Sequence, residues 1–260
     1  MPIFPAAQRA CPPVLVSADG SPEHRFVSTP GKAFAIGDAP SYLKTHYWWA
    51  YIHPAGVRLF ERQWLVNLIL WGNYARLSDA ALSELGETLP GRTLQVACVY
   101  GDLTGRVGRR CEDCGGALDV VDVLPVQLRN LRDKLPADVR ARLMVMDSTH
   151  LQLPDGSYDR VLAFLLLHEQ PASVRRRTLH EVLRVVKPGG KVVIVDYARP
   201  YWWNPLRYLW RPVLALLEPF ALDLWRDDMT AWIAAASGAR VTSRRLFGGL
   251  YQILSVTRPG

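Results

Sequence analysis

Short apolar runs alternate with segments of helical periodicity along much of this chain. Each run is about as long as a strand that is buried on both faces of a sheet. An apolar helical repeat from Leu179 to Val186 separates the last two runs, and the Lys187–Gly190 turn ends it. Strands that alternate with helices predict a parallel, doubly wound α/β sheet of the Rossmann-like kind. The runs cover residues 118–123, 144–146, 159–167 and 191–196.

An unusual loop joins the first strand of this predicted sheet to its first helix. The strand-like residues 94–96 follow a Pro-Gly turn, and helix-like sequence begins at Asp102. In a nucleotide-binding unit this loop is normally rich in glycine, so that the backbone can approach a bound cofactor closely. Here Ala97, Val99 and Tyr100 occupy the early positions and only Gly101 remains. A cofactor bound at this loop is therefore expected to sit in an unusual way.

The flanking regions differ in composition from the core. Residues 1–40 are rich in Pro, Gly and Ser and predict an irregular N-terminal arm. We expect residues 41–260 to form a single domain, with an aromatic helical cap over 41–88 and the Rossmann-like core over 89–260. An apolar insertion is predicted within that core near 200–225.

This order of elements resembles the class I S-adenosylmethionine-dependent methyltransferase fold. Residues 179–196 are similar to the late motif of the quinone C-methyltransferases of the ubiquinone and menaquinone pathways, and Asp147 followed by 153–159 fits the same family. The resemblance implies S-adenosylmethionine as cofactor, with Asp122 at its ribose and Asp147 beside its adenine. The residues that this resemblance assigns to cofactor binding are Gln95, Ala97, Val99, Tyr100, Gly101, Asp122, Val123, Asp147 and Ser148.

Two N-terminal segments point to a narrower group. The aromatic-His-Pro segment 42–54 and the segment 60–74 resemble the signature of the rhodoquinone biosynthesis (RquA) family, and the altered loop at 96–104 matches that family as well. The resemblance implies conversion of ubiquinone to rhodoquinone for anaerobic respiration. A ring methoxy group is replaced by an amino group, with S-adenosylmethionine as amino donor and a requirement for manganese (Mn²⁺). The alternatives are a conventional S-adenosylmethionine-dependent quinone or lipid methyltransferase, and a non-catalytic quinone-binding assembly protein.

Gln95 stands where ordinary members of the fold carry an acidic residue. A carboxylate there favours the ammonium form of the cofactor's α-amino group and raises its pKa, whereas a neutral side chain does not. Because a free amine is a nucleophile, we expect Gln95, with Val99 and Tyr100 crowding the loop, to turn this amine toward the quinone. The alternative is that Gln95 is a neutral replacement with no effect on function. The Tyr100 hydroxyl is expected to bind the donor or a ring carbonyl.

A manganese ion would require oxygen and imidazole ligands. Asp147, His168 and Glu169 are the predicted set, because they follow strands whose carboxyl ends border the active site in such folds. His168 is also a candidate catalytic residue. The alternative is that its ring forms part of the wall of the substrate pocket. His46 and His53 are seven residues apart and share one face if their segment is helical. With Trp49 they are predicted to cover the quinone, and simple packing beside aromatic residues is the alternative.

Eight of the nine tryptophans lie within residues 48–71 and 202–225. Because tryptophan favours the membrane interface, Trp202 and Trp203 are predicted to contact the quinone or lipid, with a packed cap over the sheet as the alternative. The net charge of +7 favours binding to an anionic membrane surface or to nucleic acid. Because the sequence contains no RNA-binding motif, we favour the membrane. The sequence contains no uninterrupted apolar stretch of about 18 residues, so no transmembrane helix is predicted. We therefore expect a cytoplasmic protein that is peripherally associated with inner-membrane lipid.

Overall fold

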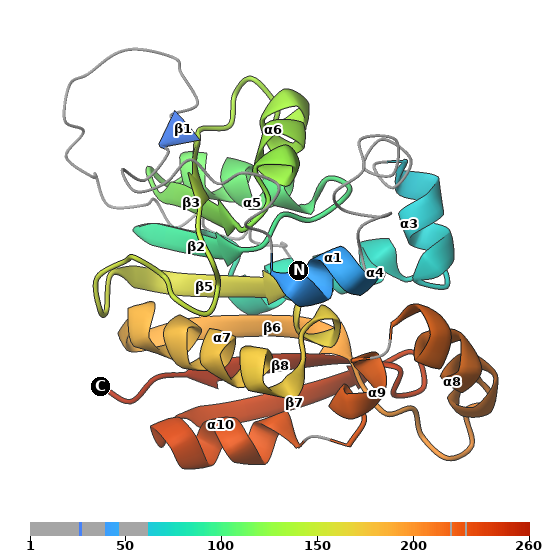
Figure 1. Cartoon of the computed structure of the whole chain (residues 1–260). Helices are drawn as coiled ribbons and strands as arrows, with labels where there is room; N and C mark the ends of the chain where they lie inside the picture. The colour runs from blue at the N-terminus through green and yellow to red at the C-terminus, as the bar shows by residue number, and fades with distance from the viewer. Residues whose placement is uncertain (1–25, 28–39, 47–61, 219, 227) are drawn as a thin grey trace, which may run out of the picture.

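A mixed sheet of eight strands forms the centre of the molecule (Figure 1). The computed structural model describes residues 26–27, 40–46, 62–218, 220–226 and 228–260. The strand order is β1-β4-β3-β2-β5-β6-β8-β7, and β8 runs antiparallel to both of its neighbours while the other pairs are parallel. This topology confirms the predicted doubly wound α/β fold. The strands are β1 (Phe26–Val27), β2 (Arg92–Val96), β3 (Ala117–Asp122), β4 (Ala141–Val145), β5 (Tyr158–Phe164), β6 (Val186–Tyr197), β7 (Arg240–Leu246) and β8 (Tyr251–Thr257).

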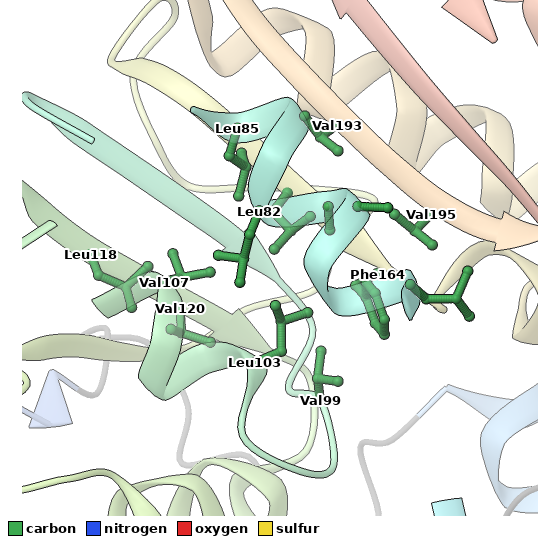
Figure 2. Close-up of a cluster of buried hydrophobic side chains, with 14 of the residues drawn as sticks. Leu82, Leu85, Val99, Leu103, Val107, Leu118, Val120, Phe164, Val193 and Val195 are labelled. Carbon is green, nitrogen blue, oxygen red and sulfur yellow. The ribbon is translucent and has the colours of Figure 1, made fainter. Parts of the chain in front are cut away.

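Helices cover both faces of the sheet. On one face α4, α5 and α6 pack against the strands, and Figure 2 shows part of this core, where leucines of α4 lie with valines of β6 and α5. On the other face α7 and α10 close a second apolar core. The helices are α1 (Ser41–His46), α3 (Gln63–Ile69), α4 (Tyr74–Leu85), α5 (Leu103–Glu112), α6 (Pro125–Lys134), the 3₁₀ helix η3 (Leu167–Glu169), α7 (Ala172–Val185), α8 (Leu206–Leu217), α9 (Ala221–Leu224) and α10 (Met229–Ser237).

Strand β2 divides its side chains between these two cores. Successive residues of a strand point to opposite faces of the sheet. Leu94 and Val96 therefore join the core beneath α7, whereas Gln95 points to the face that α5 covers and is completely buried there. The direction of the Gln95 side chain is thus set by its position in the strand.

The strand predicted over 159–167 ends earlier than expected. β5 stops at Phe164 because Leu165 adopts a positive φ of 52°, which interrupts the extended conformation. The Leu165 amide still donates to the Val195 carbonyl at 2.7 Å, so the chain stays attached to β6 as it turns into η3. This early turn places His168 and Glu169 on a short helix beside the end of the sheet.

Candidate functional site

A cavity of about 260 Å³ lies beyond the carboxyl ends of the parallel strands. Strand order reverses around β2 in the middle of the sheet, and open α/β sheets bind ligands at such a switch point. The loop after β2 and the ends of β3, β4, β5 and β6 supply one part of the lining, and residues of α1, α3, α4, α6, η3 and α8 supply the rest. The predicted site residues that line it are Ala97, Val99, Tyr100, Asp122, Val123, Asp147, Ser148, His168 and Glu169.

The loop after β2 has the backbone conformation of a glycine-rich loop, although no glycine stands at its early positions. Ala97 has a φ of 73°, in the left-handed region that favours glycine. Gly101 has a φ of 86°, and a Cβ atom there would overlap the hydroxyl of Tyr74. That hydroxyl accepts a hydrogen bond from the Leu103 amide at 3.1 Å and donates to Asp102 Oδ1 at 3.2 Å. The single glycine that remains is therefore required by the Tyr74 hydroxyl, which fixes the start of α5.

Helix α6 holds the outer side of the same loop. Lys134 Nζ donates to the Val99 carbonyl at 2.8 Å, and Gln127 Nε2 donates to the Tyr100 hydroxyl at 2.9 Å. Tyr100 lines the cavity, and this hydrogen bond fixes the position of its oxygen.

Gln95 supports the loop from beneath. Its Nε2 donates to the Ala97 carbonyl at 3.0 Å and to Thr104 Oγ1 at 2.9 Å, and Gln95 is not among the residues that line the cavity. Within the part of the chain that the structure describes, its Oε1 is buried without a hydrogen-bond partner. Any influence of Gln95 on a bound ligand must therefore pass through the loop or through its electrostatic field.

Two acidic residues border the cavity at the ends of β3 and β4. Asp122 accepts hydrogen bonds from the Cys98 amide at 2.7 Å and the Leu124 amide at 2.8 Å, and its burial raises the pKa of the carboxyl to about 6. Asp147 Oδ1 accepts from the Thr149 amide at 2.8 Å. Because each carboxylate oxygen can accept more than one hydrogen bond, Asp122 retains the capacity to bind the adjacent hydroxyls of a ribose. This donor and acceptor set fits a nucleoside.

His168 forms a buried pair with Asp196 at the end of β6. His168 Nδ1 lies 2.9 Å from Asp196 Oδ1, and Asp196 also accepts from the amides of Leu167 and Tyr197, each at 2.7 Å. The imidazole meets the Tyr197 ring edge-on at a centroid distance of 4.8 Å. Sequence reasoning missed Asp196, although it ends a buried strand in the same manner as Asp122.

The charges around His168 decide its protonation. Burial disfavours the imidazolium, but the neighbouring carboxylates of Asp196, Glu218 and Glu169 outweigh it and raise the pKa of His168 to about 9. His168 is therefore protonated at neutral pH. Since Nδ1 forms a hydrogen bond with Asp196, the Nε2–H group remains to donate a hydrogen bond to a ligand in the cavity.

The predicted manganese ligands line one cavity but do not form a metal site. His168 Nδ1 is occupied by Asp196, and Nε2 lies 3.9 Å from Glu169 Oε1. Among the described residues, no group of three or more His, Cys, Asp or Glu side chains is arranged to hold a metal ion. The arrangement therefore does not fit a bound manganese ion.

The predicted quinone-contacting residues lie elsewhere or outside the described ranges. Trp202 and Trp203 are exposed in the loop before α8 and do not line the cavity. Trp49 and His53 fall within 47–61, outside the described residues, and His46 is the last residue of α1. Aromatic side chains that sequence reasoning did not select line the cavity instead: Tyr42, Tyr74, Phe164, Tyr197 and Trp210.

Comparison with known proteins identifies relatives of this chain. Residues 93–190 match a family model described as a methyltransferase domain. The chain is 32% identical over 164 residues to the 2-methyl-6-phytyl-1,4-hydroquinone methyltransferase of Synechocystis, a match over 59% of this chain and 47% of that enzyme. The chain thus spans about half the length of this relative. It is also 32% identical over 220 residues to the ubiquinone/menaquinone biosynthesis C-methyltransferase UbiE of Ectopseudomonas mendocina, over 75% of this chain and 84% of that enzyme.

A solved structure shares the fold. The SAM-dependent methyltransferase from Aquifex aeolicus superposes with a TM-score of 0.57 at 14% identity, over 80% of this chain and 99% of that chain. This likeness concerns the fold and confirms that the predicted methyltransferase-like architecture is correct.

The Tyr74 contact predicts a specific effect of substitution at Gly101. We expect Gly101→Ala to lower the free energy of unfolding by about 1–3 kcal/mol more than Gly72→Ala, because the new methyl group must displace Tyr74. Gly72 is a matched control, with a φ of 72° and, apart from its chain neighbours, no atom of the described residues within 4 Å of an added Cβ. Urea unfolding of both variants measures the difference, and equal losses would contradict the role of Tyr74.

The His168–Asp196 pair predicts a pH-dependent stability. The pKa of His168 in the fold, about 9, exceeds its usual value of about 6.5. The stabilisation that protonated His168 gives to the fold is therefore fully present below pH ~6.5 and is lost as the pH rises through ~9. The difference in unfolding free energy between the wild type and His168→Gln should shrink over this window. His180→Gln, on an exposed histidine of α7, is the control. A difference for His168→Gln that is constant with pH would refute the prediction.

Proposed function

Because this chain belongs to the class I S-adenosylmethionine-dependent methyltransferase family, we propose that it is a transferase that uses S-adenosylmethionine to modify the ring of a quinone. The observation that carries this proposal is a single cavity with a ribose-type acceptor, Asp122, and a buried cationic donor, His168, between apolar walls. Relatives named for methylation of quinone or hydroquinone rings support the same class of substrate.

The residues present fit this cofactor at its nucleoside end. Asp122 would hold the ribose hydroxyls, and Asp147, Ser148 and Val123 would surround the adenine. The methionine end would face the loop from Ala97 to Gly101. When bound, S-adenosylmethionine would supply an activated methyl group on sulfur. In the conventional reaction this group would pass from sulfur to a ring carbon, which would lose its hydrogen as a proton.

His168 and Asp196 would act on the ring oxygen of the substrate. The protonated imidazole donates from Nε2 to a carbonyl or a phenolate oxygen in the cavity, which stabilises negative charge on that oxygen. Asp196 is the positioning residue, since it binds Nδ1 and fixes the orientation of the ring. Ring carbons ortho or para to a phenolate are electron-rich, so holding the anion prepares the ring to accept a methyl group.

Amination of ubiquinone to rhodoquinone is the second candidate. It is favoured by one observation, the neutral Gln95 beneath a loop that lacks its early glycines. In this reaction S-adenosylmethionine would supply its α-amino nitrogen in place of the ring methoxy group, which would leave with a proton as methanol. Release of the amino product would balance with water, because the quinone ring can accept two electrons from the α-carbon of the donor. The products would be an aminohydroquinone and an α-keto acid. The His168 imidazolium would assist the addition by binding the ring carbonyl, where negative charge develops.

Both candidates act on a substrate with a long apolar tail. Such a quinone resides in a bilayer, so the same proposal includes a cytoplasmic location with peripheral contact to inner-membrane lipid. None of the helices in the described residues is both long and apolar enough to cross a membrane.

The proposal is tested with a doubly labelled cofactor. The purified chain is incubated with S-adenosylmethionine that carries nitrogen-15 at the amino group and deuterium in the methyl group, and with ubiquinone or its ring-demethylated hydroquinone. Mass spectrometry of the product should show the deuterated methyl group for the conventional reaction and nitrogen-15 for amination. A quinone that remains unlabelled under all conditions, with and without manganese, would overturn the enzymatic proposal.

Gln95→Glu separates the two candidates. A buried carboxylate under the loop favours the ammonium form of the donor, so we expect nitrogen-15 transfer to fall at least about tenfold. Thr93→Val is the matched control, because Thr93 is buried on the same side of β2 and the substitution introduces no charge. Amination at the wild-type rate by a folded Gln95→Glu protein would show that the charge at this position does not control the amine.

A further inference from the structure

The two helices that wall the cavity on one side are strongly apolar on their outer surface. All nine large hydrophobic side chains that are exposed among the described residues belong to α3, α8 or the residues next to them. Isolated exposed hydrophobic residues are normal, but a contiguous group of them marks an interaction site. We call this surface the α3–α8 apolar face. Its members are Trp64, Leu68, Trp71, Tyr201, Trp202, Trp203, Tyr208, Leu209 and Leu216.

This face is continuous with the cavity. Val66, Ile69 and Leu70 of the α3 segment line the cavity from one side, and Val213 and Leu214 of α8 line it from another. The two helices meet where the Trp71 and Trp210 rings contact edge to face, with centroids 5.0 Å apart, and Trp210 itself lines the cavity. Figure 1 shows α3 and α8 on the same side of the molecule. The apolar outer face and this part of the cavity wall therefore belong to the same two helices.

The charges on these helices are of one sign. Neither α3 nor α8 contains an acidic residue, while α8 carries Arg207 and Arg211 and the exposed Arg62 precedes α3. Exposed aromatic and leucine side chains beside arginines are the composition of helices that lie in a membrane interface and contact anionic headgroups. Helix α8 has 12 residues, too few to span a bilayer.

We propose that the α3–α8 apolar face docks on the surface of a bilayer that contains anionic lipid, and that the apolar tail of the substrate passes between α3 and α8 into the cavity. The second part rests on the proposed quinone chemistry, and the first part does not. In this orientation the ring reaches His168 while the tail remains in contact with lipid. The arginines of α8 lie at the level of the phosphates, and the apolar side chains enter the outer part of the acyl region.

Vesicle flotation tests the docking surface. The wild-type chain should bind vesicles of phosphatidylcholine with phosphatidylglycerol more tightly than vesicles of phosphatidylcholine alone, and added salt should weaken this binding. The variant Leu68→Ser/Leu209→Ser changes one side chain on each helix, both 66% exposed, and should bind at least about tenfold more weakly. Arg207→Gln/Arg211→Gln should remove the preference for the anionic lipid.

A matched pair of arginines controls for net charge. Arg240→Gln/Arg244→Gln removes two exposed charges from the edge strand β7, outside the α3–α8 apolar face, and should leave vesicle binding unchanged. Equal loss for both arginine pairs, or undiminished binding by Leu68→Ser/Leu209→Ser, would overturn the proposal. A dimer in lipid-free buffer that this leucine variant dissociates would also overturn it, because the face would then bind a second copy of the chain.

Turnover of two substrates separates this inference from the proposed function. Leu68→Ser/Leu209→Ser should convert a short-tailed, water-soluble quinone at the wild-type rate and should lose at least about tenfold on a long-tailed quinone embedded in vesicles. If the wild type binds vesicles but converts no quinone, the proposed function fails and the docking surface stands. If it converts the soluble quinone but does not bind vesicles, the docking surface fails and the proposed function stands.

Discussion

Parallel pairing of the central strands is the constraint from which the site follows. It brings the carboxyl ends of β2 to β6 to one edge of the sheet, where backbone groups that leave the strands need new hydrogen-bond partners. Two acidic residues meet this need in the same way. Asp122 at the end of β3 binds the Cys98 amide in the loop of neighbouring β2, and Asp196 at the end of β6 binds the Leu167 amide in the turn after neighbouring β5. The cavity lies between these two braced segments, so its shape is set largely by backbone contacts.

The proposed function gives the two braced segments different chemical tasks. The segment after β2 faces the region suited to a nucleoside, and Gln95, Tyr74 and Lys134 fix it from three sides. The segment after β5 presents His168, whose charge is maintained by the neighbouring carboxylates of Asp196, Glu218 and Glu169. In the proposed function, cofactor binding and ring activation fall on opposite sides of one cavity. The apolar helices α3 and α8 line the remaining side, where the proposed hydrophobic tail would leave the site.

The sequence predicted the fold because few folds other than a doubly wound sheet are compatible with apolar runs that alternate with helical repeats. It also located Asp122, Asp147 and His168, since polar residues directly after buried strands gather at one edge. The direction of Gln95 was open to the same reasoning, because Leu94 and Val96 are its apolar neighbours and must point the opposite way. Asp196 and Tyr74 were not selected because their roles depend on contacts with segments distant in sequence. The end of β5 was missed because a positive φ at a leucine has no sequence signal.

Ala97 holds the loop after β2 in a backbone conformation that costs free energy. The residue has a φ of 73°, which an alanine adopts only at a conformational penalty of about 1 kcal/mol and a glycine adopts freely. Ala97 also lines the cavity, so its methyl group occupies space that a glycine would leave open to a bound ligand. The same methyl group therefore strains the backbone and limits how closely a ligand can approach it.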